Sequence, residues 1–266
     1  MNWMEYLQAI IMGAVEGITE FLPVSSTGHL IITADLIDFH GELASNFEIV
    51  IQLAAILAVC WLYRHKLFEV VRGLPGDARS WRFVENLAVA FIPAAAIGFV
   101  FHDRIKQWLF NPVTVAIALI VGGFVILLVE RFHFREHVKT VDDLQPRDAL
   151  KVGCVQVLAL IPGTSRSGAT IIGGLLFGLS RQAATEFSFF LAIPIMFAAT
   201  AFDLAKNLSR LNSDYIAVLA IGFVTAFITA VVAVRGFVRF VSKHNFTAFA
   251  IYRIAFGAIV LWYYLR

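Results

Sequence analysis

Residues 16–29 read Glu16-Gly-Ile-Thr-Glu20-Phe-Leu-Pro-Val-Ser-Ser-Thr-Gly-His29 and lie inside an apolar segment that runs from Leu7 to Ile37. An acidic residue costs about 2.5–3.5 kcal/mol at the centre of a membrane helix, even on lenient insertion scales. Pro23 and Gly28 bracket a turn in this stretch. The segment therefore predicts a helix over 9–21, a break and a second helix, which together form a re-entrant hairpin rather than a full membrane span.

A second apolar segment, Val152 to Leu179, is interrupted in the same way by Ile161-Pro-Gly-Thr-Ser-Arg-Ser-Gly-Ala-Thr170. The two interruptions align in a register of 140 residues, in which Ser25 and Gly28 meet Ser165 and Gly168, Phe47 meets Phe187, and Glu16 meets Gln156. Each half then holds one hairpin and three full spans, and an odd number of spans inverts the second copy. We expect one integral membrane domain over 1–266, with a first repeat over 1–131 and a second, inverted repeat over 148–266.

Six other stretches are long and apolar enough to cross about 30 Å of hydrocarbon. They cover residues 47–63, 83–101, 112–129, 183–204, 215–234 and 246–265. The 266-residue chain is 59% hydrophobic and only 15% charged, against roughly 25% charged in a soluble domain, which excludes a soluble enzyme. Its net charge of +2 shows no basic bias toward nucleic acid. The sequence predicts an all-α polytopic membrane protein with six transmembrane helices and two re-entrant helical hairpins.

The distribution of Lys and Arg predicts the orientation in the bilayer, because cytoplasmic loops carry an excess of both. Fourteen of the 21 basic residues belong to the loops at 64–82 and 235–243 and to the central connection, which holds residues 131–151 and Arg181, and five lie on the opposite side. The richer side should be cytoplasmic, which places both termini outside. The first hairpin should then enter from outside and the second from the cytoplasm.

The two breaks should meet in one polar pocket, because non-helical backbone persists at membrane depth only where it is buried in protein or lines a wet cavity. Glu16 and Glu20 are four residues apart and share one face of a helix. Their oxygens suit a hard divalent cation, and one of them could instead serve as a general base.

The remaining polar residues of the two breaks supply the other parts of a phosphoryl-transfer site. Ser25, Ser26 and Thr27 offer hydroxyls, and His29 can serve as base, acid or nucleophile. Arg166 sits at a new helix start, where free amides and a guanidinium suit phosphate. Pairing of Arg166 with Glu16 or Glu20 is the alternative. The candidate catalytic residues are Glu16, Glu20, Ser26, His29 and Arg166; the candidate phosphate-binding residues are Ser25, Thr27, Ser165, Arg166, Ser167 and Thr170; the candidate metal ligands are Glu16 and Glu20.

The two motifs resemble those of the bacterial undecaprenyl-diphosphate phosphatases, the BacA/UppP family linked to bacitracin resistance. Residues 16–29 look like the family's glutamate-rich motif, and Pro162-Gly-Thr-Ser-Arg-Ser-Gly-Ala-Thr170 fits its Pro-Gly-x-Ser-Arg-Ser-x-x-Thr pattern throughout. Asn46-Phe-Glu48-Ile-Val-Ile-Gln52-Leu also resembles the family's first full span. With matching chain length and span count, the resemblance covers nearly the whole sequence.

The resemblance implies a hydrolase that converts undecaprenyl diphosphate to undecaprenyl phosphate and inorganic phosphate. This reaction recycles the lipid carrier for peptidoglycan synthesis, and hence for cell wall biogenesis and cell shape, on the outer face of the bacterial inner membrane. In the family's terms, Glu16 and Glu20 serve Mg²⁺ or Ca²⁺ or act as the base, and Ser165, Arg166 and Thr170 bind the diphosphate. Ser26 and His29 compete as nucleophile, and we favour Ser26. The partners are then the polyprenyl lipid and the bilayer, and a homodimer is one expected assembly state.

A transporter or flippase of a phosphorylated lipid carrier is the alternative, since inverted repeats with broken helices are common among transporters. Arg253 and Glu186 lie near the cytoplasmic ends of their predicted spans, where we expect them to snorkel toward water. Glu48 is expected to support the site from the first span.

Overall fold

The computed structural model describes residues 3–132, 134–207 and 216–266, and within these ranges the chain is helical. An isolated bridge between Val138 and Leu179 is the only strand-like pairing in the described part. The helices are α1 (Trp3–Thr19), α2 (Ser26–Leu36), α3 (Glu42–Leu62), α4 (Arg64–Gly73), α5 (Ala78–Leu109), α6 (Pro112–Arg131), η1 (Val141–Asp143), α7 (Pro146–Gln156), η2 (Val157–Leu160), α8 (Arg166–Leu176), α9 (Arg181–Asn207), α10 (Ile216–Val241) and α11 (Thr247–Leu265).

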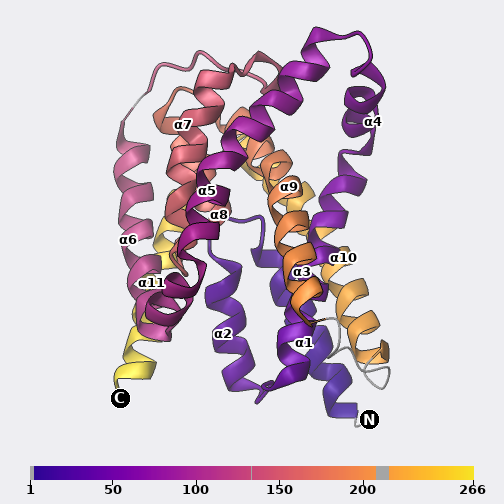
Figure 1. Cartoon of the computed structure of the whole chain (residues 1–266). Coiled ribbons are helices and arrows are strands. Elements are labelled where there is room, and N and C mark those ends of the chain that lie inside the picture. Colours follow the sequence, from indigo (N-terminus) through magenta and orange to yellow (C-terminus); the bar gives the residue numbers. More distant parts are fainter. Residues whose placement is uncertain (1–2, 133, 208–215) are drawn as a thin grey trace.

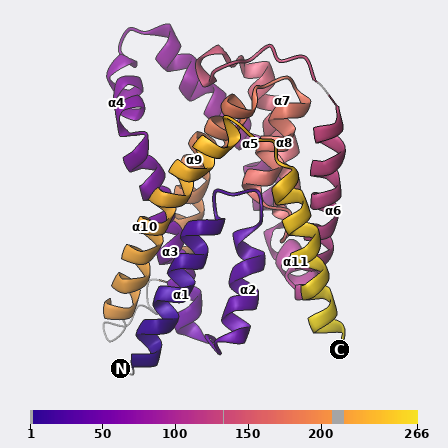
Figure 2. The same ribbon diagram turned by 180° about the vertical axis from the view of Figure 1, so that it is seen from behind.

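Both interrupted segments form a helix, a break and a second helix and enter the bundle from opposite ends, while a re-entrant path in the membrane stays a prediction. Figure 1 shows α1 and α2 rising from the end that holds both termini, while α7 and α8 descend from the other end. The two breaks meet near mid-height, and the long helices surround them in both views (Figures 1 and 2). The fold therefore brings together the two motifs that are 140 residues apart in the sequence.

Among the described residues, five helices are long and apolar enough to cross a membrane. They are α5, α6, α9, α10 and α11, and α3 joins them if it is counted with α4 as one span bent by 73°. The helix α4 and the full length of α5 go beyond the predicted spans, and Tyr215, the predicted start of the fifth span, lies outside the described residues. The chain is thus a polytopic all-helical protein, and the number of six spans stays a prediction.

The surface of the bundle is far more apolar than that of a soluble protein. Large apolar side chains cover the outside: Phe99, Trp108 and Val100 are 82%, 74% and 70% exposed. Polar side chains such as Thr185 and Ser188 are fully buried. Only a hydrocarbon environment makes this arrangement favourable, because an apolar surface of this extent in water favours aggregation.

Helix α1 packs against α10 with almost no side chain between the two backbones. A Cβ at Gly17 would overlap Thr229 and the backbone of Ala226, and one at Gly13 would lie 2.6 Å from the carbonyl oxygen of Gly222. Small residues at such interfaces are typical of membrane helices, because close backbone approach gives dense van der Waals packing. The first arm of the first hairpin, α1, is therefore held closely against α10.

Candidate active site

The two breaks have the same local backbone. Ser25 and Ser165 precede α2 and α8 with φ of 70° and 73°, in the left-handed region that non-glycine residues rarely adopt. Each serine caps the helix that follows: Oγ of Ser25 accepts from the amide of Gly28 at 3.4 Å, and Oγ of Ser165 accepts from the amide of Gly168 at 3.1 Å. Unfavourable backbone conformations of this kind concentrate at functional sites, because the surrounding structure must hold them in place.

Hydrogen bonds from the second break hold it directly against the first. The hydroxyls of Ser167 and Ser165 donate to the carbonyl oxygen of Leu22 at 2.7 and 3.5 Å. The hydroxyl of Thr170 donates to the carbonyl of Arg166 at 2.9 Å, and its oxygen lies in hydrogen-bonding contact with Oγ of Ser188 at 2.7 Å. The hydroxyls of Ser167 and Thr170, both predicted to bind phosphate, therefore already have hydrogen-bond partners within the protein.

Glu20 lies at the junction and contacts residues from both breaks. It follows the end of α1 by one residue, and its amide still bonds to the carbonyl of Glu16 at 2.9 Å. The hydroxyl of Ser26 donates to its Oε2, while Nη2 of Arg166 lies 3.5 Å from its Oε1. Nη1 of Arg166 donates to the carbonyl of Ser188 at 2.9 Å, and its buried Nε has no protein partner. A hydroxyl, a carboxylate and a guanidinium with a free donor therefore stand in contact.

A cavity of about 210 Å³ opens beside this junction. Its polar wall includes six of the predicted site residues, namely Glu20, Ser25, Ser26, Thr27, Ser165 and Arg166. An apolar wall comes from α5, η2 and α9, with Ala94, Leu160, Ile195, Met196 and Ala199. A ligand that fits both walls has a charged end and an apolar end.

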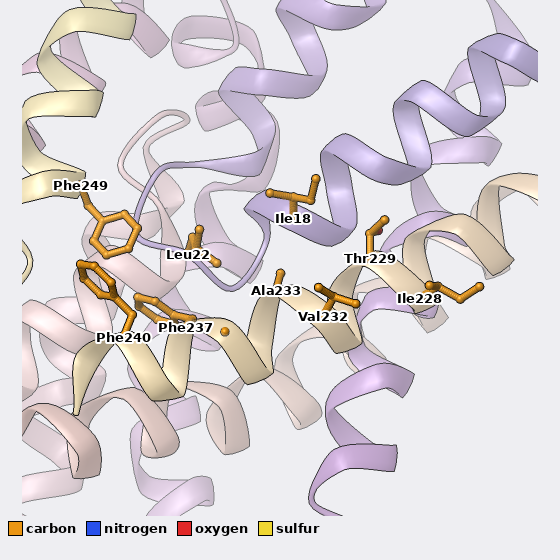
Figure 3. Close-up of a pocket in the computed structure, with 10 residues that line it drawn as sticks. Ile18, Leu22, Ile228, Thr229, Val232, Ala233, Phe237, Phe240 and Phe249 are labelled. Carbon is orange, nitrogen blue, oxygen red and sulfur yellow. The ribbon is translucent and has the colours of Figure 1, made fainter. Parts of the chain in front are cut away.

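A larger cavity, of about 510 Å³, lies on the other side of the first break, between α1, α10 and α11. Figure 3 shows its lining, in which Phe237, Phe240 and Phe249 stand at one end and Leu22 and Ile18 close one side. Its one polar side chain, Thr229, donates to backbone carbonyls of its own helix. This groove can hold hydrocarbon, but it has no side chain suited to bind phosphate or to catalyse its transfer. The larger of the two cavities is therefore not the candidate active site.

Glu16 lies deeper than the cavity and is 1% exposed. Its Oε2 is buried without a hydrogen-bond partner, and an unpaired carboxylate oxygen at such a site is expected to meet a cation or a water molecule. The donor set fits a hard cation such as Mg²⁺ or Ca²⁺, which takes carboxylate oxygens. Within the described ranges, no group of three or more His, Cys, Asp or Glu side chains forms a complete metal site, so Glu16 and Glu20 would supply only part of the coordination.

His29 is turned away from the carboxylates. Its Nδ1 lies 2.7 Å from the carbonyl oxygen of Ser25, and its Nε2 lies 2.6 Å from the hydroxyl of Tyr252. In the neutral ring, Nδ1 donates to the carbonyl and Nε2 accepts from the tyrosine. The ring also stacks on Phe256 at 4.2 Å between centroids. Both nitrogens are occupied, and His29 is not among the described residues that line the cavity.

Two residues that matter at this junction were missed in the sequence. Gln156 lines the cavity, is 2% exposed, and has no protein partner for either amide atom; its register position opposite Glu16 was the available signal. The prediction that Arg253 snorkels was wrong: it is 1% exposed and donates only to backbone carbonyls inside the bundle. Glu48 lies on α3 and is exposed, and its expected support of the site stays a prediction.

Comparison with known proteins agrees with the resemblance that the two motifs indicate. Residues 9–259 match the family described as "Bacitracin resistance protein BacA". The chain is 60% identical to the undecaprenyl-diphosphatase of Nitrosospira multiformis over 98% of this chain and 96% of that protein. Identity is 58% to the one of Nitrosomonas eutropha and 57% to the one of Pseudomonas aeruginosa, again over 98% of this chain and 95% and 94% of the relatives. The chain therefore belongs to the BacA family.

Proposed function

We propose that this protein hydrolyses undecaprenyl diphosphate to undecaprenyl phosphate and inorganic phosphate, and so recycles the lipid carrier for peptidoglycan synthesis. The observation that carries the proposal is the contact of Ser26 and Arg166 with the two oxygens of Glu20, at the edge of a cavity with one polar and one apolar wall. The name undecaprenyl-diphosphatase, which relatives at 57–60% identity share, supports the same substrate.

Ser26 serves as the nucleophile in this proposal and Glu20 as its base. Oγ of Ser26 attacks the terminal phosphorus while its proton passes to Glu20, and the bond to the bridging oxygen breaks. Undecaprenyl phosphate leaves with that oxygen and takes up the proton. Glu20 then removes a proton from water, which attacks the phosphoserine; inorganic phosphate leaves, and the Ser26 oxygen regains its proton. The hydrogen bond between Ser26 and Glu20 supports this assignment.

The phosphoryl oxygens are bound by groups from the second break. Arg166 has its Nε free and its Nη1 anchored on the Ser188 carbonyl, so its guanidinium is held ready for an anion. Thr27 also lines the cavity, as does Ser165, whose hydroxyl would have to leave the carbonyl of Leu22 to bind phosphate, and the unpaired amide of Gln156 offers a further donor. Removal of these donors should weaken binding of the diphosphate rather than the attack itself.

Glu16 and Glu20 would hold the divalent cation, Mg²⁺ or Ca²⁺. When bound, such an ion neutralises negative charge on the phosphoryl group. The unpaired Oε2 of Glu16 supports this assignment. Chelation with EDTA should lower phosphate release by the purified protein, and Mg²⁺ or Ca²⁺ should restore it.

Nucleophilic attack by His29 is less compatible with the geometry. Its Nδ1 and Nε2 are engaged by the Ser25 carbonyl and by Tyr252. Its position one turn after Ser26 instead supports a role in holding Ser25, which precedes the nucleophile, in its unfavourable conformation. A phosphorylated enzyme trapped by acid would distinguish the two, because phosphoserine survives acid and phosphohistidine does not.

The arrangement in the bilayer is also part of the proposal. Six spans, two re-entrant hairpins and an inverted repeat over 1–131 and 148–266 agree with the opposite entry of the hairpins and with the matching conformations of Ser25 and Ser165. The basic loops lie at the end opposite the termini, which favours a cavity open to the outside of the bacterial inner membrane. A cysteine at Phe110, 53% exposed, should react with an impermeant reagent from outside, and one at Gly76 should not.

Phosphate release decides between hydrolysis and transport. The full chain, purified in detergent, should release phosphate from farnesyl and undecaprenyl diphosphate, and Glu20→Gln should lose this activity. If the wild-type protein releases no phosphate with Mg²⁺ or Ca²⁺ present, the enzyme proposal is wrong and a carrier of the same lipid remains. The homodimer stays an expectation, and the mass of the protein in nanodiscs tests it.

A further inference from the structure

Arg253, on α11, uses all of its hydrogen-bonding capacity on backbone carbonyls. A guanidinium has five N–H donors, and five carbonyl oxygens lie within bonding distance. Nε donates to Leu119 at 3.3 Å; Nη1 donates to Pro23 at 3.1 Å and to Thr164 at 2.9 Å; Nη2 donates to Ala118 at 3.2 Å and to Gly163 at 3.0 Å. The side chain is 1% exposed, so its five donors depend on these carbonyls rather than on water.

The five acceptors come from three separate parts of the chain. Pro23 belongs to the first break, Gly163 and Thr164 to the second, and Ala118 and Leu119 to α6. The breaks are held to each other by Ser165 and Ser167 as well, but those hydroxyls share a single acceptor, the carbonyl of Leu22. Arg253 is the described residue that joins both breaks and a long helix through one rigid, planar group.

Helix α6 is built to receive this group. A Cβ at Gly122 would overlap the guanidinium of Arg253, so a larger residue at this position would force the guanidinium to shift away from its place beside α6. The ion pairs of the described residues do not include Arg253. A buried cation without a carboxylate is expensive, and a purely structural core would favour an apolar residue of the same volume.

We propose that Arg253 is a positioning residue, which fixes the distance between the break that carries the attacking hydroxyl and the break that carries the phosphate-binding guanidinium. This inference rests on the proposed function, in which Ser26 acts on a phosphoryl group held by Arg166. Reacting atoms must meet within a narrow range, and a displacement of about 1 Å can cost about 10²-fold in rate. Loss of Arg253 should therefore slow the chemical step while the second break still binds the diphosphate.

The test compares Arg253→Lys and Gly122→Ala with the wild-type protein. Lysine keeps the charge but has three donors for five carbonyls, and the new methyl group of Gly122→Ala displaces a guanidinium that is otherwise intact. Both variants should lower kcat for farnesyl diphosphate, Arg253→Lys by about 10²-fold, while KM stays within about threefold of the wild-type value. Activity is expressed per monodisperse, folded molecule.

Two controls separate positioning from general stability. Arg181→Met removes another partly buried guanidinium, which pairs with Glu130 at 2.6 Å far from the breaks; it should lower the Tm with unchanged kcat and KM. Gly236→Ala adds a methyl group where the structure has open space and should leave the Tm, kcat and KM unchanged. If Arg253→Lys and Gly122→Ala behave like these controls, the proposal is overturned.

A measurement without substrate keeps the inference testable if the proposed function fails. Spin labels at Leu36 and Leu176, which are exposed ends of α2 and α8, report the relation of the two hairpins in a chain whose two cysteines are replaced. The wild-type protein should give one narrow distance distribution, and Arg253→Lys should broaden or shift it. An unchanged distribution contradicts positioning by Arg253, whereas absence of phosphate release from the wild-type protein contradicts only the phosphatase.

Discussion

The two helix breaks share a backbone but carry opposite chemistry. In the register of 140 residues, Ser25 and Ser165 are equivalent, and both cap a helix with φ near 70°. The next position is Ser26 in the first break and Arg166 in the second. The same place at the start of a helix thus holds a hydroxyl that contacts Glu20 in one half and a guanidinium that contacts the other oxygen of Glu20 in the other.

This difference shows how one local structure can supply both parts of a reaction. A helix start points its first side chains and amides toward the same region, and the opposite entry of the hairpins brings two such starts face to face. A different residue at one aligned position, Ser26 in one break and Arg166 in the other, is then sufficient for one break to supply the attacking hydroxyl and the other to bind the phosphoryl group. The two halves also differ at Glu16, which aligns with Gln156 in the register, and at Glu20, which aligns with Leu160.

Removal of the hydroxyl at the first helix start should have the largest effect. Ser26→Ala should lower kcat by about 10³-fold or more, because the proposed covalent intermediate cannot form. Thr33→Val, a change on the same helix outside the cavity lining, is the control. Trapping with radiolabelled substrate should give phosphoserine in the wild-type protein; a Ser26→Ala variant that still turns over would reassign the nucleophile.

A change of the equivalent residue in the second half should have a smaller effect, and of another kind. Arg166→Lys keeps the charge but loses the planar fork, so we expect a loss of about 10²-fold in kcat/KM. Most of this loss should appear in KM for the diphosphate. A variant with normal KM and reduced kcat would contradict the division between attack and binding.

Gln156 offers a test in which activity and stability should move in opposite directions. Gln156→Leu removes two buried amide atoms without protein partners, so the Tm should rise. KM for farnesyl diphosphate should increase about tenfold, as expected for one lost hydrogen bond to a charged group. Gln182→Leu, at an exposed amide that bonds to Glu186, should leave KM unchanged. An unchanged KM in Gln156→Leu would show that the amide meets only water.

The capping serines should give the smallest difference between the halves. Ser25→Ala and Ser165→Ala each remove a cap and place alanine at a positive φ, so each should lower the free energy of unfolding by about 1–2 kcal/mol. Ser25→Gly and Ser165→Gly should cost less, since glycine accepts this conformation. Chemical denaturation in detergent measures both pairs. Unequal losses in the two halves would show that the matching backbones are supported differently.

Much of this fold is predictable because the length and apolar composition of membrane helices identify them in the sequence. The breaks are equally visible, since Pro, Gly and ionisable residues are conspicuous inside apolar segments. The contact among Glu20, Ser26 and Arg166 was predictable as well. Non-helical backbone at membrane depth must be buried in protein or line a cavity, and this requirement brings the two breaks together. Helix α4, which continues α3 after a bend of 73°, was not predicted because its sequence is too polar for a span.

The direction of individual side chains was not predictable in the same way. Arg253 lies six residues after the start of α11. At this position a long side chain can either extend toward the membrane surface or point into the bundle. Only the tertiary structure supplies the carbonyls that it bonds. The partner of His29 was likewise not predictable, because Tyr252, which bonds to its Nε2, is 223 residues away in the sequence.

The close packing of α1 on α10 has a consequence for motion. Because Gly13 and Gly17 leave no space between the two backbones, we expect these helices to move as one unit together with the break that follows α1. Admission of a lipid headgroup to the cavity should then depend on the apolar wall. That wall is formed by α5 and α9, which contain Pro93 and Pro194 within their helical ranges. Proline removes one backbone hydrogen bond and allows a helix to bend, so we expect the entrance to open by bending at these two prolines while the catalytic break stays still.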